Sequence, residues 1–158
     1  MIPETLTLEN FGPYVQETLD FRRFAEVPLF LISGKTGSGK STMFDAMRFA
    51  LYGDGGSDQG ERDGSSLRSN FAGASDPTVV TFTFTQGEKR YVVKRQPKQV
   101  LKKKRGKGNK IVNADAVLSI YEDGKEVNEF TKTRDVDTRL QALLGLTAEQ
   151  FTQIVLLP

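Results

Sequence analysis

Residues 34–41, with the sequence GKTGSGKS, restrict the possible folds of this chain more than any other feature. They match the pattern G-x-x-x-x-G-K-[S/T], in which glycines let a loop curl so that successive backbone N–H groups point at a phosphate. A continuous apolar run at residues 29–33 predicts a strand buried on both faces before the loop. Residues 41–52 carry apolar side chains at helical spacing after it. A strand, a phosphate-binding loop and a helix are therefore expected in the order that a P-loop requires.

The residue types in this loop suit a nucleoside triphosphate and its Mg²⁺ ion. Lys40 supplies a positive charge for the β- and γ-phosphates, and the hydroxyl of Ser41 is a ligand for Mg²⁺. The N-terminus of the following helix adds a dipole that favours anions. A chance match in a glycine-rich turn is the alternative, which the agreement between the motif and its flanking elements disfavours. The pattern is met by Gly34, Gly39, Lys40 and Ser41, and Gly37 and Thr42 also fit it.

The composition limits the remaining chemistry. The chain has no His and no Cys, which excludes disulfides, the usual zinc sites and any triad built on histidine. No stretch approaches eighteen consecutive apolar residues, so no membrane span is expected. Hydrolysis of a nucleotide needs a carboxylate after a second buried strand, but no run of four apolar residues followed by Asp-Glu occurs. We therefore expect a cytoplasmic nucleotide-binding chain with no catalytic residue of its own.

Local patterns predict the rest of the fold. Alternating polar and apolar residues indicate three β-hairpins, at residues 4–9 with 16–21, 78–85 with 90–95, and 116–121 with 125–130. An amphipathic helix is expected at 133–144, and the capping-box pattern at 147–150 predicts a last helix running to about residue 156. A surface loop at 54–66 and a short helical turn within 65–72 are expected between them. The fold class is α/β with α+β character, that of a P-loop NTPase.

Basic residues gather in one segment of a chain whose net charge is only +2. Residues 94–110 contain nine Lys or Arg and no acidic residue. Such a run either binds DNA phosphates or is a solvated hairpin loop, and both interpretations remain open. No aromatic residue lies between Val92 and Ile120, so stacking on single-stranded bases is not expected there. The candidate DNA-binding residues are Lys102, Lys103, Lys104, Arg105 and Lys107.

Beyond the loop, the sequence resembles the N-terminal lobe of the SbcC family, the SMC-like, ABC-type ATPase subunits of a bacterial nuclease that repairs DNA double-strand breaks. The resemblance covers essentially the whole chain. It is carried by Glu9-Asn10-Phe11, by Asp20-Phe21, by the P-loop, by Phe44-Asp45-Ala46, and by residues 50–53, 67–72 and 151–158. It implies lobe I of an ABC-type ATPase head, with a mixed core sheet and an antiparallel β-subdomain. Residues 1–158 are then one incomplete domain, which lacks the coiled coil and the C-terminal lobe of the family.

The resemblance also implies a mechanism and partners. ATP would drive two heads to dimerise, and the engaged dimer would gate access of double-stranded DNA or DNA ends to an SbcD-type nuclease subunit. The chain would need its own C-terminal lobe for hydrolysis, so these residues alone are expected to be inactive. The expected location is the cytoplasm, in association with the nucleoid. The resemblance adds Thr36 and Ser38 to the residues around the triphosphate, and it places Arg68, Ser69 and Asn70 near the adenine.

One contact of the family is in doubt because of the residues that stand here. Some relatives place an arginine directly after the Asn-Phe pair to contact the nucleotide, whereas this chain has Gly12 and Pro13. Tyr14 could stack on adenine, but a core or surface tyrosine is the commoner outcome. Two other functions stay open: a small P-loop kinase, and an ATP-dependent DNA-binding protein of the RecF type without a coiled coil. About thirty residues of predicted hairpin before the P-loop favour the ABC-type lobe over the kinase.

Overall fold

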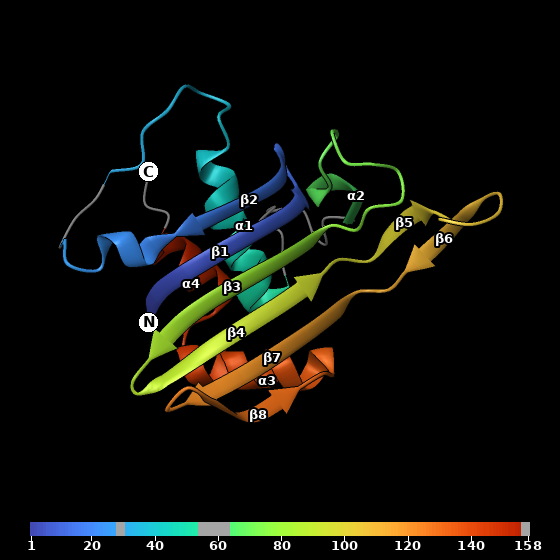
Figure 1. The fold of residues 1–158 in the computed structure, drawn as a ribbon. Helices are drawn as coiled ribbons and strands as arrows, with labels where there is room; N and C mark the ends of the chain where they lie inside the picture. The colour runs from blue at the N-terminus through green and yellow to red at the C-terminus, as the bar shows by residue number, and fades with distance from the viewer. Residues whose placement is uncertain (28–30, 54–63, 156–158) are drawn as a thin grey trace.

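The computed structural model describes residues 1–27, 31–53 and 64–155. Its main feature is a six-stranded sheet with the order β2-β1-β3-β4-β7-β8 (Figure 1). A separate two-stranded sheet, β5 with β6, continues beyond β4 and β7. The strands are β1 (Ile2–Phe11), β2 (Tyr14–Asp20), β3 (Val79–Gln86), β4 (Lys89–Gln96), β5 (Gln99–Lys102), β6 (Asn109–Val112), β7 (Asp115–Glu122) and β8 (Lys125–Phe130).

All three predicted hairpins are confirmed. β1 pairs with β2, β3 with β4, and β7 with β8, each antiparallel. Short turns join them, and the turn between β7 and β8 uses Asp123 and Gly124, both with positive φ, as the tightest hairpin turns require. Turns of this kind fix the register, so that Phe82 lies opposite Val93 and Phe84 opposite Tyr91.

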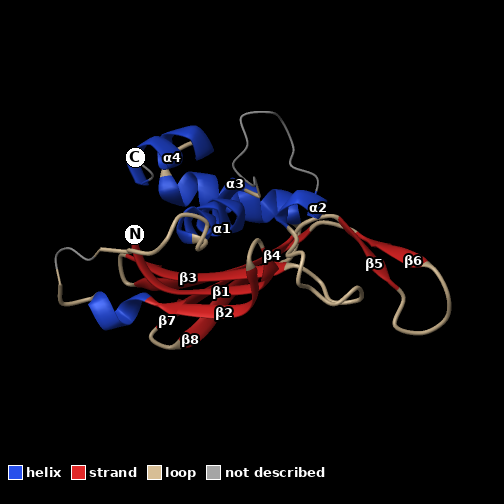
Figure 2. Cartoon of the chain, turned by 90° about the horizontal axis from the view of Figure 1, so that it is seen from above, coloured by secondary structure: helices blue, strands red, loops and turns tan. Residues whose placement is uncertain are grey.

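The helices lie over one face of the sheet (Figure 2). They are α1 (Lys40–Tyr52), α2 (Gly64–Leu67), α3 (Thr133–Leu144) and α4 (Ala148–Val155), with a 3₁₀ turn, η1, at Phe21–Phe24. The capping box predicted before α4 is present: the Thr147 N–H donates to Gln150 Oε1 (2.9 Å), and the Gln150 N–H donates to Thr147 Oγ1 (3.2 Å). Gly53 ends α1 and Gly145 ends α3 in the left-handed conformation.

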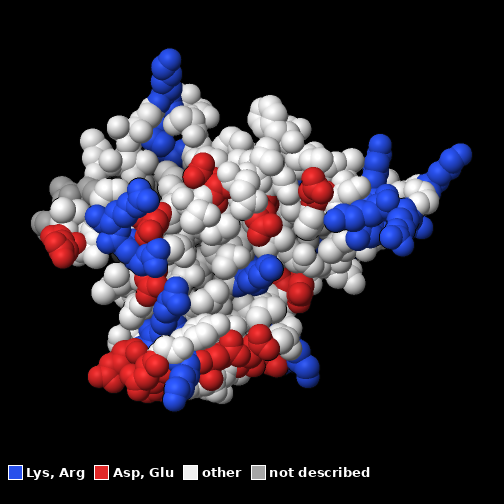
Figure 3. All heavy atoms as spheres, viewed as in Figure 1, with Lys and Arg blue, Asp and Glu red and all other residues white. Residues whose placement is uncertain are grey.

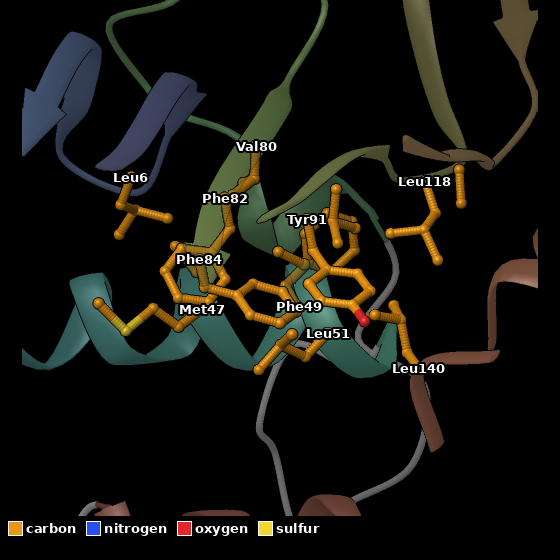
Figure 4. Packing of buried hydrophobic residues seen from close by; sticks show 14 of the residues in the cluster. Leu6, Met47, Phe49, Leu51, Val80, Phe82, Phe84, Tyr91, Leu118 and Leu140 are labelled. Atoms are coloured by element: carbon orange, nitrogen blue, oxygen red, sulfur yellow. The ribbon is translucent and has the colours of Figure 1, made fainter. Parts of the chain in front are cut away.

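The core lies between α1, α3, α4 and the covered face of the sheet. Figure 4 shows apolar side chains of β1, β3 and β7 converging on those of α1 and α3. Burial of each large apolar side chain contributes about 1.5–3 kcal/mol, so this layer holds α1 firmly against β3. The largest fully buried side chains are Phe11, Phe82, Phe84, Leu6, Leu8, Leu51, Leu118, Ile120, Leu140, Val80, Val93 and Val136.

The predicted strand before the P-loop is wrong for the residues that can be seen. Residues 31–33 are not a strand, and Leu31 is 89% exposed; residues 28–30 lie outside the described part. A strand buried on both faces needs hydrogen-bonded neighbours and a covering layer, and no described strand pairs with this segment. Every pairing among the described strands is antiparallel, so the expected mixed core sheet is not formed by them.

Candidate nucleotide-binding site

The P-loop lies at the N-terminus of α1. Gly39 is the residue that precedes the helix, with φ 91° and ψ 7°, and no side chain caps the helix there. The first N–H groups of a helix have no partner within it, so those of α1 are left to an external acceptor. Together with the helix dipole they form an anion-binding end, as the motif predicts.

The ammonium group of Lys40 lies across the beginning of the loop. Its Nζ donates to the carbonyl oxygens of Gly34 (2.7 Å) and Lys35 (3.0 Å) and approaches Ser38 Oγ at 3.5 Å. A cation held only by neutral acceptors is available to a stronger, charged acceptor, because charge-assisted hydrogen bonds are about twice as strong as neutral ones. The loop therefore holds its one motif cation where a phosphate would meet it.

The two glycines of the loop with positive φ have different surroundings. A Cβ built on Gly37 (φ 83°) would have no atom within 4 Å, so the outer part of the loop is open. A Cβ built on Gly39 would lie 2.5 Å from Tyr14 Oη and 2.9 Å from Pro13 Cγ. The inner part is therefore filled by the turn between β1 and β2.

That turn packs against both the loop and the first turn of α1. A Cβ on Gly12 would lie 2.5 Å from Thr42 Cγ2, so Gly12 is needed for the close approach as well as for its φ of 55°. Tyr14 Oη donates to the Gly39 carbonyl at 3.2 Å. Sequence reasoning assigned these residues only to a turn and missed their contact with the P-loop. The Phe-Gly-Pro-Tyr sequence was its one available signal.

Arg68, Ser69 and Asn70 follow α2 and lie beside the same turn. The Ser69 N–H donates to the Asn10 carbonyl (2.9 Å), and Arg68 forms an antiparallel bridge with Phe11. The Arg68 guanidinium donates to the carbonyls of Gly73 and Asp76, closing the loop that follows. Ser69 is 3% exposed and Asn70 is exposed. Their contact with a nucleotide stays a prediction.

The Mg²⁺ ligand predicted from the sequence, Ser41, is exposed on the first turn of α1. Within the described ranges, no three or more Asp or Glu side chains are grouped so that they could hold a metal ion. Mg²⁺ usually keeps several waters and binds through one or two protein groups plus substrate phosphates. The residues present therefore fit an ion that arrives with the triphosphate.

The basic segment forms a projection that we call the basic ribbon: β5, β6 and the connecting residues 103–108 (Figures 1 and 2). Lys and Arg side chains gather on it, while acidic side chains gather at the end of the hairpin β7–β8 (Figure 3). The five candidate DNA-binding residues are all exposed. Arg95, which belongs to the same basic run in the sequence, is instead buried, and donates to the Ala50 carbonyl (3.0 Å) and to Asp137 Oδ1 (2.8 Å).

Comparisons with known proteins agree with this arrangement. A family model described as AAA domain matches residues 5–158. Over the whole chain, it is 45% identical to the SbcC subunit of the nuclease SbcCD from Lactococcus lactis, 41% to that from Staphylococcus saprophyticus and 38% to that from Vibrio cholerae. The resemblance to SbcC is thereby confirmed. The chain spans 15 to 16% of the length of these relatives.

A search of the described helices finds none that is long and apolar enough to cross a membrane. The P-loop geometry at the start of α1 lies within the residues that the family model matches. The chain belongs to the AAA domain family, a family of P-loop NTPases.

Proposed function

We propose that this chain is the ATP-binding lobe of a DNA-repair ATPase. The observation that carries the proposal is the loop at the start of α1, where the first helix N–H groups and the Lys40 ammonium face one concave stretch of backbone. The main chain of residues 36–42 and the Lys40 ammonium would hold the phosphates, and Ser41 would contribute its hydroxyl to Mg²⁺. Bound ATP supplies the anhydride whose hydrolysis drives the cycle.

Calorimetry of Mg-ATP binding to the full chain tests this proposal. Lys40→Ala should weaken binding by about 10- to 100-fold, the range expected for losing a hydrogen bond to a charged group. Lys35→Ala is the matched control, because it removes an exposed lysine from the same loop and leaves the backbone carbonyl that Lys40 contacts. Equal affinities for the Lys40→Ala variant and the wild type would contradict the proposal.

We propose further that the whole protein acts as a dimer of such heads. Its relatives are named as subunits of the SbcCD nuclease, which supports an SbcD-type partner and a role in admitting double-stranded DNA or DNA ends to it. Hydrolysis would need the protein's own C-terminal lobe, and the cytoplasmic nucleoid is the place where such an enzyme meets DNA. ATP-dependent dimerisation of the full protein, measured by light scattering, would support this, and a monomer at saturating Mg-ATP would contradict it.

The antiparallel hairpins favour this function over a small kinase. Kinases with a P-loop are built from β-α-β crossovers, whereas every pairing between the described strands here is antiparallel. An ATP-dependent DNA-binding protein of the RecF type has the same head and remains the second candidate.

DNA binding is proposed for the basic ribbon. Lys102, Lys103, Lys104, Arg105 and Lys107 are exposed on a projection with no acidic residue, which is the charge pattern of a phosphate-binding surface. A two-stranded ribbon is also narrow enough to enter the major groove of DNA.

A further inference from the structure

Tyr14, at the start of β2, is bonded to the part of the P-loop that turns into α1. Its hydroxyl donates to the Gly39 carbonyl at 3.2 Å, and the Ser38 carbonyl lies 3.5 Å away as an alternative acceptor. The Gly39 carbonyl also accepts the first hydrogen bond of the helix, from the Met43 N–H (3.2 Å). Two donors from different elements therefore fix the direction of one loop carbonyl.

The direction of a carbonyl fixes the direction of the N–H in the same peptide. A trans peptide is planar, so its C=O and its N–H point to opposite sides. The Gly39 carbonyl belongs to the peptide that carries the Lys40 N–H, and the Ser38 carbonyl belongs to the peptide that carries the Gly39 N–H. Holding these carbonyls on the Tyr14 side turns both N–H groups away from it, toward the open side of the loop.

The contact depends on a glycine and on a protonated phenol. Only glycine leaves room for the ring, since a Cβ on Gly39 would lie 2.5 Å from Tyr14 Oη and 2.9 Å from Cζ. Partial burial raises the pKa of Tyr14 above its ordinary value of 10.0, and the neighbouring Glu17 carboxylate raises it further. The hydroxyl thus keeps its proton, and remains a donor, throughout the neutral range.

We propose that Tyr14 is a positioning residue for ATP, which holds the peptides of Ser38 and Gly39 so that the N–H groups of Gly39 and Lys40 face the phosphates. The inference rests on the proposed nucleotide-binding function. Tyr14 does not touch the ligand; it reduces the reorganisation that the loop undergoes on binding.

The test is Tyr14→Phe in the full chain, because this change removes only the hydroxyl and keeps the ring that lies against Gly39. Tyr121→Phe is the matched control: it also removes one phenol hydroxyl, but from β7, where that group donates to Glu126 Oε2 (3.0 Å). Three quantities are measured for each variant: the Kd for Mg-ATP by calorimetry, the amide chemical shifts of Gly39 and Lys40 without nucleotide, and the free energy of unfolding in urea.

Tyr14→Phe is expected to weaken Mg-ATP binding by about threefold to tenfold, as for one neutral hydrogen bond, and to shift the amide resonances of Gly39 and Lys40. Tyr121→Phe should change neither. A merely structural role would lower the unfolding free energy and leave the Kd and these amide shifts unchanged, which would overturn the inference while the proposed function stands. A wild-type chain that binds no Mg-ATP would overturn both.

Discussion

The P-loop and the basic ribbon are built from similar residues but are held in different ways. Both present lysines, and both contain glycines with nearly equal positive φ, 91° at Gly39 and 95° at Gly108. Around Gly39 the loop is enclosed, because Tyr14 and Pro13 occupy the space where a side chain would lie. Around Gly108 no atom lies within 4 Å of that space.

This difference matches what each region would bind. A triphosphate is one compact anion, so its site needs backbone donors fixed to within a fraction of an ångström, and packing supplies that. The phosphates of DNA form a long, repeating array, which charge alone attracts without a fixed geometry. We therefore expect the P-loop to be sensitive to shape and the tip of the ribbon to be sensitive to charge.

The largest effect is expected when the same substitution is made at the two matched glycines. Gly39→Ala adds both the strain of positive φ and a clash with Tyr14, and should lower the unfolding free energy by about 2–4 kcal/mol. Gly108→Ala adds the strain alone, about 1 kcal/mol. Urea unfolding of the two variants measures both, and Mg-ATP affinity should fall only for Gly39→Ala. Equal losses of stability would show that the enclosure of Gly39 is unimportant.

The base of the ribbon should resemble the P-loop more than the tip does. Gln99, which is 3% exposed, accepts from the Thr78 N–H (2.8 Å) and donates to the Thr78 carbonyl (3.2 Å). Gln99→Ala leaves both buried groups of Thr78 without this partner and should cost about 2–3 kcal/mol of unfolding free energy.

Gln96→Ala is the control for this second prediction, since it removes one exposed hydrogen bond, to the Asn113 carbonyl (3.2 Å). It should cost about 0.5 kcal/mol or less. Chemical denaturation measures the difference. A Gln99→Ala variant as stable as the Gln96→Ala variant would mean that the ribbon is not anchored through this side chain.

Charge reversal at the tip should change DNA binding without changing the fold. Glutamate at Lys102, Lys103, Lys104 and Arg105 should make the plot of log affinity against log salt shallower by about 1 for each lysine or arginine that no longer neutralises a phosphate. Affinity for a DNA duplex near 0.1 M salt should fall by about tenfold or more. Reversing Lys132 and Arg139, two exposed basic residues outside the ribbon, controls for net charge. An unchanged slope would remove the ribbon from the DNA-binding surface.

Local patterns were enough to predict the hairpins, α3 and the capping box of α4. In each of these the deciding interactions join residues close in sequence: a turn of two residues fixes a register, and Thr147 bonds to Gln150 three positions on. The P-loop and α1 were predictable for the same reason. The motif carries its own backbone chemistry in eight consecutive residues.

Interactions between distant residues were not predictable from the pattern. Tyr14 reaches Gly39 across twenty-five positions, and nothing in a Phe-Gly-Pro-Tyr turn specifies its acceptor. Arg95 counted as part of a basic surface run, although its partners Ala50 and Asp137 lie more than forty residues away and bury it. The apolar residues before the P-loop indicated a buried strand, but a strand is buried only where other strands meet it.

The smallest effect is expected at Asp20, which lies outside both regions and serves as a reference for a single exposed ion pair. Its carboxylate accepts from the side chain of Arg22 at 2.8 Å and from the Arg22 N–H at 3.1 Å, at the start of η1. These contacts, the side-chain hydrogen bond first, lower the pKa of Asp20 to about 2. Because an unfolded Asp has a pKa near 3.9, the ionised form is favoured in the folded chain. Its contribution is complete above about pH 4 and is lost as the pH falls through about 2. The stability advantage of the wild type over Asp20→Asn, measured by urea unfolding, should therefore shrink between about pH 5 and pH 2. An advantage that is constant over this range would mean that the bonds of Asp20 do not depend on its charge.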